Sequence, residues 1–136
     1  MIPEESIFFK ISRVAQKANR FWSTMIQDMS LTPVQGLVLL FLHDQDQVTF
    51  SELSRRSGLD SATLTGIIDR LERSNLIMRM QKPGDRRAFL ICLTVEGGKT
   101  AETVNDIADL ANRDFLSFLP KTERNSFIQM LDKIRE

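Results

Sequence analysis

The stretch from Thr49 to Gly97, TFSELSRRSGLDSATLTGIIDRLERSNLIMRMQKPGDRRAFLICLTVEG, decides the fold of this chain. Thr49 and Glu52 are spaced as a capping box, which predicts the start of a short helix. Gly58 is typical of a helix C-terminus, and a second helix is predicted over about residues 61–74. Two helices joined by a short glycine-containing turn form the helix-turn-helix pattern.

A predicted β-hairpin follows this pair of helices. Apolar runs at 76–80 and 88–93 flank the basic segment QKPGDRR, and Pro83-Gly84 within it favours a tight turn. A helix-turn-helix followed by a basic hairpin is a winged helix. The predicted fold class is therefore mainly α with a small β-hairpin wing.

The second helix has one apolar face, and the residues opposite it are small or polar. At 100° per residue, the apolar face consists of Leu64, Ile67, Ile68 and Leu71. Gly66 lies opposite, where a glycine costs about 1 kcal/mol relative to alanine. Either the helix backbone closely approaches another surface there, such as a DNA groove, or the glycine is simply tolerated.

The flanking segments predict helices that cover the winged helix and join two subunits. We expect a single 1–136 domain, with 32–96 as the DNA-binding part and dimerisation helices in 4–29 and 98–136. Residues 4–29 carry a helical apolar stripe wider than one packing partner needs. Thr32, Pro33 and Gln35 predict the start of the next helix.

Composition excludes several classes of protein. The 136 residues are 42% hydrophobic and 26% charged, which is typical of one soluble globular domain. One cysteine, Cys92, and one histidine, His43, provide neither a disulfide, nor a metal site, nor a plausible catalytic set. No apolar run approaches the roughly 18 residues of a membrane helix. We expect a cytoplasmic protein that is not an enzyme and has no cofactor.

Zero net charge first argues against nucleic acid as a partner, because DNA-binding domains often have a pI above about 9. The chain has 18 Lys and Arg against 18 Asp and Glu. Residues 49–99 nevertheless hold nine cations and six acids, a net +3, and the flanking segments total −3. A dimer would present this positive segment twice.

The run from Thr63 to Gly97 resembles the MarR family of bacterial transcriptional regulators. The most specific part is Asp85-Arg86-Arg87, followed at the family's spacing by Thr94 and Gly97. Asn75 stands where the family usually has glycine, and Gly66 stands where many members carry a longer polar or basic side chain. The order of the helices agrees over nearly the whole chain.

The resemblance implies a homodimer that binds double-stranded DNA at a pseudo-palindromic operator and acts as a repressor. The second helix would enter the major groove, and its N-terminus also offers N–H groups to a phosphate. Arg87 would reach the minor groove, held there by a salt bridge from Asp85. The expected DNA-contacting residues are Ser61, Thr63, Thr65, Arg70, Arg73, Lys82, Arg86 and Arg87.

The resemblance also implies release by a small aromatic or phenolic ligand. Candidate pocket residues are Phe9, Arg13, Trp22, Phe41 and His43. For each of them the simpler alternative, in which the aromatic side chains belong to the core and Arg13 is solvated, is favoured over the pocket. The alternative function is a winged-helix module that binds another protein and does not bind DNA. Neutral charge and Gly66 motivate that alternative.

Overall fold

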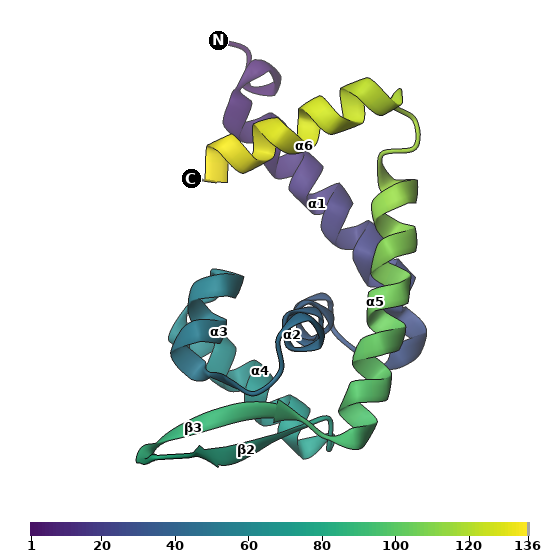
Figure 1. The fold of residues 1–136 in the computed structure, drawn as a ribbon. Helices are drawn as coiled ribbons and strands as arrows, with labels where there is room; N and C mark the ends of the chain where they lie inside the picture. Colours follow the sequence, from purple (N-terminus) through teal and green to yellow (C-terminus); the bar gives the residue numbers. More distant parts are fainter. Residues whose placement is uncertain (136) are drawn as a thin grey trace.

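The computed structural model describes residues 1–135, and within that range the chain forms six α-helices and one antiparallel sheet of three strands (Figure 1). The sheet order is β1-β3-β2. This architecture confirms the predicted fold class. The elements are α1 (Ile7–Ile26), α2 (Pro33–Asp44), β1 (Val48–Thr49), α3 (Phe50–Ser57), α4 (Ser61–Arg73), β2 (Ile77–Lys82), β3 (Asp85–Leu93), α5 (Val95–Phe115) and α6 (Lys121–Arg135).

The helix-turn-helix forms as the capping residues predict, with one difference. The Thr49 side chain accepts a hydrogen bond from the Glu52 backbone N–H at 3.2 Å. The Glu52 carboxylate, however, binds the Arg55 guanidinium at 2.6 Å and so does not complete the capping box. Gly58 ends α3 with a left-handed φ of 69°, a conformation that glycine adopts without a steric penalty.

The wing is a two-stranded hairpin with a two-residue turn. Lys82 pairs with Asp85 in the ladder, and Gly84 between them has a φ of 82°. Pairing continues to Ile77 opposite Leu93. The strands are longer than the apolar runs at 76–80 and 88–93, and the register shifts between Gln81 and Lys82, because Gln81 pairs with Phe89 and the ladder skips residues 86–88.

The core forms where α2, α4 and the sheet meet. All four residues of the predicted apolar face of α4 are buried, so that prediction is confirmed. They pack with Leu39 and Leu42 of α2, with Leu53 of α3 and with Ile91 of β3. The burial of this face leaves the opposite side of α4 free for a partner.

A tight junction fixes the hairpin and α5 relative to the end of α4. Asn75 takes the left-handed conformation, with a φ of 59°. The Thr94 hydroxyl donates to the Asn75 carbonyl at 2.7 Å and accepts from the Gly97 N–H at 2.9 Å. A Cβ on Gly97 would lie 1.7 Å from the Leu76 carbonyl oxygen, so this position requires glycine.

The single helix predicted over 4–29 is divided in the structure. The α1 helix spans Ile7–Ile26, and short 3₁₀ turns precede and follow it at Pro3–Glu5 and Gln27–Met29. Ser6 is the break at the N-terminal side, because its ψ of 130° is extended. Of the residues in α1, Ile26 alone is buried, so most of its apolar stripe remains uncovered in the single chain.

In the part of the chain that the structure describes, no single helix is long and apolar enough to cross a membrane. The segments Ile7–Met29 and Pro33–Asp44 pass this test of length and composition only as a pair, and they are bent by 78° at the break between them.

Candidate nucleic-acid interface

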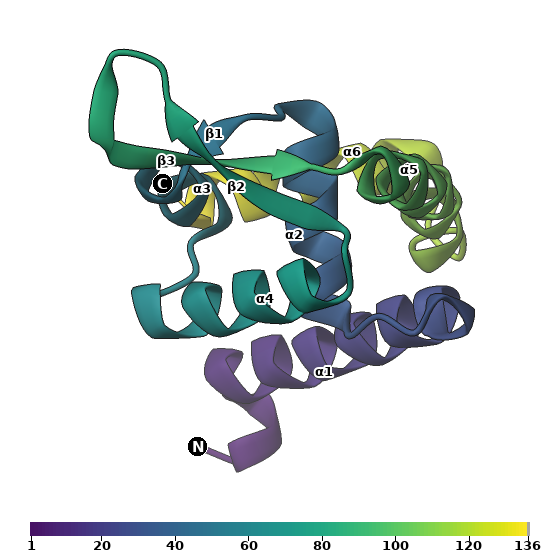
Figure 2. The same ribbon diagram turned by 90° about the horizontal axis from the view of Figure 1, so that it is seen from below.

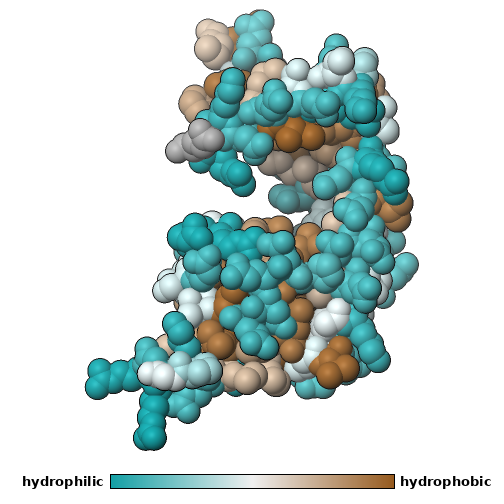
Figure 3. All heavy atoms as spheres, in the orientation of Figure 1, coloured by the Kyte–Doolittle hydropathy of each residue, from teal (hydrophilic) through white to brown (hydrophobic). Residues whose placement is uncertain are grey.

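The exposed side of α4 and the hairpin lie on the same side of the molecule. Figure 2 shows α4 beside β2 and β3, with the hairpin tip extending beyond the helices. Figure 3 shows a strongly hydrophilic surface at the hairpin tip. A helix and a basic hairpin therefore face one large partner together.

The hydroxyl groups at the start of α4 are partly used inside the helix. The Thr63 hydroxyl donates to the Asp60 carboxylate at 2.9 Å, and the Thr65 hydroxyl donates to the Ser61 carbonyl at 2.7 Å. In this conformation the hydroxyl protons are used inside the helix, and both threonine oxygens keep lone pairs as acceptors. Ser61 is exposed at the first position of α4.

Asp60 occupies the N-terminus of α4, which corrects the expectation of an open phosphate site there. Its carboxylate accepts the Thr63 N–H at 2.8 Å as the N-cap of the helix. This bond and the one from the Thr63 hydroxyl hold the pKa of the Asp60 carboxyl below its ordinary value of 3.8. A negative charge at this point repels a phosphate that approaches along the helix axis.

Arg70 and Arg73 are exposed near the other end of α4, on the side that faces away from the core. Two acidic residues of the same helix, Asp69 and Glu72, precede them directly in the sequence. Arginines at a helix C-terminal end are also favoured by the helix dipole. They are placed to meet phosphates beside a groove.

Arg79 of β2 bridges both of those acids and offsets one of their two negative charges. Its guanidinium bonds Glu72 at 2.6 Å and Asp69 at 2.9 Å. These contacts, the one with Asp69 first, raise the pKa of Arg79 above its ordinary value. From the sequence alone, Arg79 was only one of the nine cations in residues 49–99. Asp69 and Glu72 lie three apart on one helix face, which is the signal that could have predicted a shared partner.

The hairpin tip carries the three predicted cations, Lys82, Arg86 and Arg87, all exposed. The predicted salt bridge between the Asp85 and Arg87 side chains does not form. The Asp85 carboxylate instead accepts a hydrogen bond from the Arg87 backbone N–H at 3.0 Å. Across residues 1–135, no salt bridge joins these two side chains. Asp85 therefore shapes the tip backbone and leaves the Arg87 guanidinium free to reach outward.

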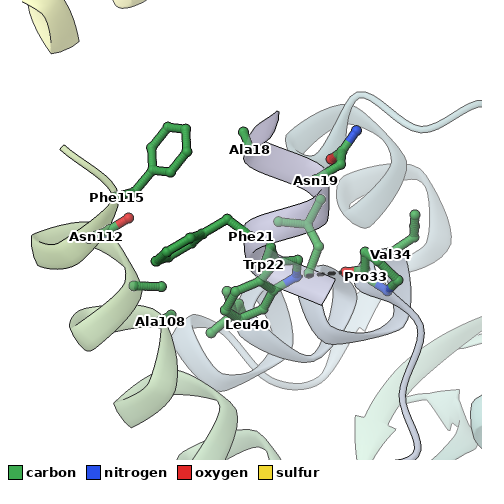
Figure 4. Close-up of a pocket in the computed structure, with 12 residues that line it drawn as sticks. Ala18, Asn19, Phe21, Trp22, Pro33, Val34, Leu40, Ala108, Asn112 and Phe115 are labelled. Carbon is green, nitrogen blue, oxygen red and sulfur yellow. Dashed lines mark hydrogen bonds between the residues drawn. The ribbon is translucent and has the colours of Figure 1, made fainter. Parts of the chain in front are cut away.

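A cavity of about 380 Å³ lies between α1, α2 and α5, well away from the α4 face (Figure 4). Within it the Trp22 indole N–H donates to the Pro33 carbonyl at 2.9 Å, and the Phe21 and Phe115 rings are 5.4 Å apart. Its lining residues are Ala18, Asn19, Phe21, Trp22, Pro33, Val34, Leu37, Leu40, Ala108, Ala111, Asn112 and Phe115.

Of the five residues predicted to form a ligand pocket, Trp22 alone lines this cavity of the described chain. Phe9 and Arg13 are exposed on the first half of α1, and His43 is exposed at the end of α2. Phe41 packs under the Arg56 guanidinium, 5.2 Å from its ring centroid. The α-helical spacing of these residues did not show which of them turn toward α5.

Cys92 is buried in β3. Burial, together with the nearby Asp46 carboxylate, raises the pKa of its thiol. A raised pKa keeps the group in the unreactive thiol form.

A helix-turn-helix with a basic wing on the same side defines the class of winged-helix DNA-binding proteins. A sequence model of the MarR family matches residues 31–89 of this chain. Over this winged-helix segment the chain is similar to the MarR family of transcriptional regulators.

Individual relatives agree with this assignment. The chain is 29% identical to the organic hydroperoxide resistance transcriptional regulator of Bacillus subtilis, over 76% of this chain and 71% of that protein. It is 25% identical to the transcriptional repressor NicR of Pseudomonas putida, over 96% of this chain and 82% of that protein.

Among solved structures, BpsR of Bordetella bronchiseptica is 26% identical, with a TM-score of 0.92, and the match covers all of this chain and 97% of that one. The DNA binding of BpsR is regulated by 6-hydroxynicotinic acid.

Proposed function

We propose that this chain is a homodimeric repressor that binds a pseudo-palindromic operator through α4 and the wing. The observation that carries the proposal is the shared orientation of the exposed α4 face and the basic hairpin tip. The proposal assigns it no catalytic activity and places its action in the cytoplasm, where a bacterial operator is accessible.

In this proposal α4 enters the major groove and reads base edges with the polar residues of its first turns. Ser61 can donate or accept, and Thr63 and Thr65 accept from base amino groups or meet thymine methyls. Arg70 and Arg73 bind phosphates and fix the helix in the groove. The Arg79 bridge supports this role, because it offsets part of the negative charge of two acids beside the proposed DNA-binding face.

The wing reaches the adjacent minor groove. Arg87 is the inserted side chain, and narrow A/T-rich grooves attract it through their enhanced negative potential. The backbone bond from Asp85 sets the direction in which Arg87 leaves the strand. Lys82 and Arg86 contact the sugar-phosphate backbone on either side.

Dimerisation is proposed to use residues 4–29 and 98–136, with 32–96 as the DNA-binding part. Large exposed apolar side chains in these segments support the proposal, since Phe8 on α1 is 81% exposed, Phe118 in the turn before α6 69% and Ile134 on α6 73%. Contiguous exposed apolar surface of this kind marks an interface. Two-fold symmetry then predicts half-sites about one helical turn apart, roughly 10 base pairs.

We further propose that a small aromatic or phenolic ligand in the α1–α2–α5 cavity releases the DNA. The position of the cavity supports this, because it touches α1 and α5 on one side and the start of α2 on the other. The α2 helix packs against α4 in the core. A ligand that shifts α2 would therefore shift α4 relative to the second subunit.

The test is a fluorescence-anisotropy titration of the full chain with DNA from its own promoter and with random DNA of the same length. We expect tighter binding to the promoter, with an affinity that falls steeply as salt increases because phosphate contacts release counterions. Binding no stronger than to random DNA at low salt would contradict the proposal and favour the protein-interaction alternative.

A pair of variants locates the contact. Arg87→Ala should weaken promoter binding by about 1–3 kcal/mol, the usual contribution of an arginine that reads a groove. Lys133→Ala, which removes a cation from α6, should leave it unchanged. Equal effects of the two variants would refute the assignment of Arg87.

A further inference from the structure

The outward side of α4 carries very small residues over its first two turns. Ala62 and Gly66 lie one helical turn apart, opposite the buried face, and Ala62 is exposed. A Cβ added at Gly66 would meet nothing within 4 Å, so nothing in the described chain covers the helix backbone there. A recognition helix contacts base edges with its N-terminal residues. Along the centre of this side, DNA therefore meets the methyl group of Ala62 and bare backbone.

The first two turns of α4 have no side chain that reads guanine or adenine by paired hydrogen bonds. Those side chains are arginine, lysine, asparagine and glutamine, and residues 61–68 contain none of them. The hydroxyl protons of Thr63 and Thr65 are also used, because they are donated to the Asp60 carboxylate and to the Ser61 carbonyl. Guanine presents two acceptors in the major groove, N7 and O6. With the Ser61 hydroxyl as the remaining side-chain donor in these turns, a G·C pair is poorly matched.

The two carboxylates closest to these turns are occupied as well. Asp69, the next acid on the outward side of α4, is bound by the Arg79 guanidinium at 2.9 Å. Asp60 accepts both hydrogen bonds from Thr63. A carboxylate that reads cytosine must accept from its N4 amino group, and neither acid is free to do so. The C5-methyl of thymine is the base feature that remains, and apolar contact with alanine or with a threonine methyl recognises it.

We propose that Ala62 determines the sequence specificity of this chain, through contact of its methyl group with the C5-methyl of a thymine in each half-site. The oxygens of Thr63 and Thr65 accept from the N6 amino groups of adenines, so α4 recognises T·A pairs by their methyl and amino groups and not by guanine. The bare backbone at Gly66 allows the close approach that this contact needs. This specificity rests on the proposed function of operator binding.

The test replaces thymine with uracil, which removes the C5-methyl and keeps the base pair. Each thymine of the promoter duplex is substituted in turn, and the affinity of the full chain is measured by fluorescence anisotropy, with random DNA of the same length for comparison. We expect affinity to fall about fourfold at the contacted thymine of each half-site, which corresponds to one buried methyl-sized group. Thymines outside the half-sites should show no effect. At the contacted position, 5-methylcytosine should be bound more tightly than cytosine, because it carries the same methyl group.

Ala62→Gly locates the contact on the protein. This variant should bind the natural promoter about fourfold more weakly, and it should bind the uracil and thymine duplexes equally, because the contact between the two methyl groups is already lost. The two duplexes are compared for the same variant, so any effect of glycine on helix stability cancels. Ala15→Gly, the same change at an exposed alanine of α1, should keep the full sensitivity to uracil. Additive effects of Ala62→Gly and of uracil would overturn the proposal.

The remaining outcomes separate this specificity from the proposed function. Equal binding of promoter and random DNA would overturn both. Specific promoter binding that is insensitive to uracil at every thymine would overturn the specificity alone. Loss of affinity when 7-deazaguanine replaces guanine within the half-sites would also overturn it, in favour of guanine readout by Arg73 at the end of α4, because this analogue lacks the N7 acceptor.

Discussion

At the scale of single residues, glycine stands at two helical positions for different reasons. Gly97 is required by the fold, because a Cβ there would collide with the Leu76 carbonyl. Gly66 is different, since a Cβ added there meets nothing within 4 Å. The fold of the single chain therefore gives no reason for glycine at 66, which leaves two explanations: close approach of DNA to the α4 backbone, as the proposed function implies, or a tolerated surface glycine.

Gly66→Ala should therefore raise stability and weaken DNA binding. We expect the free energy of unfolding to increase by about 1 kcal/mol, from the difference in helix propensity. We expect promoter affinity to fall by about 1 kcal/mol or more, because the added methyl overpacks the interface. Thermal unfolding and anisotropy titration measure the two effects.

Gly98→Ala is the matched control for that variant. Gly98 is also helical and partly exposed, and a Cβ there also meets nothing within 4 Å. It should gain similar stability without any change in DNA affinity. Unchanged affinity in both variants would mean that Gly66 is a tolerated surface glycine.

Asp60 makes the stability of α4 depend on pH. Hydrogen bonds from the Thr63 N–H and hydroxyl hold the folded-state pKa of Asp60 below its ordinary value of 3.8. The stabilisation is therefore present above that value and is lost as the pH falls through the lower, folded-state pKa. Thermal unfolding of the native chain and of Asp60→Asn should differ most near neutral pH, and the difference should shrink in acid. A difference that does not change with pH would contradict this assignment.

At the scale of elements, side-chain contacts hold α4 and the hairpin in a fixed position relative to each other. Arg79 reaches from β2 to Asp69 and Glu72 of α4, and the Thr94–Asn75 bond closes the junction behind it. Each ion pair is partly exposed and contributes little to stability by itself. The combined effect is geometric, because the distance between α4 and the hairpin decides whether both can enter adjacent grooves.

Arg79→Met should therefore affect DNA binding more than stability. The free energy of unfolding should fall by about 0.5–1 kcal/mol, as for exposed ion pairs. Promoter affinity should fall further, because Asp69 and Glu72 are then uncompensated beside the phosphates. Adding Asp69→Asn and Glu72→Gln to Arg79→Met should restore part of the affinity. If the triple variant binds no better than Arg79→Met, the electrostatic explanation is wrong.

At the scale of the whole molecule, the helices at the two ends of the chain keep large apolar side chains exposed. None of the residues described in α6 (121–135) is buried. Figure 3 shows apolar surface on the side of α6 that faces a hollow above α2 and α3, and Figure 1 shows both termini at this end. The charge is also less simply distributed than the flanking total of −3 indicates, since residues 7–26 carry four cations and no acid. The negative charge of the flanking segments lies in residues 27–48 and 100–115, each with a net charge of −3.

One substitution at this end should separate the two subunits. Ile134→Glu places a charge on an exposed apolar residue of α6, so we expect light scattering to give the mass of a monomer. Val95→Glu is the control, because Val95 is also highly exposed but lies at the wing end of α5. A dimer mass for Ile134→Glu, or a monomer mass for both variants, would contradict the proposed interface.

The features that the sequence by itself determined are those that depend on local interactions. Caps at Thr32, Thr49 and Asp60, the turn at Pro83-Gly84 and the apolar face of α4 depend on residues close together in the chain. Local patterns of this kind, and the spacing from Asp85 to Gly97, were therefore sufficient for the winged helix, the family and the exposed cations.

The tertiary structure decided the features that depend on contacts between distant segments. These include the Arg79 bridge to α4, the backbone bond that replaces the Asp85–Arg87 salt bridge, and the choice of Trp22 over Phe9, Arg13, Phe41 and His43 as a cavity residue. Helical periodicity shows that a residue lies on a given face of its helix. It does not show which other helix that face meets, because the rotation of each helix is set by packing across the whole core.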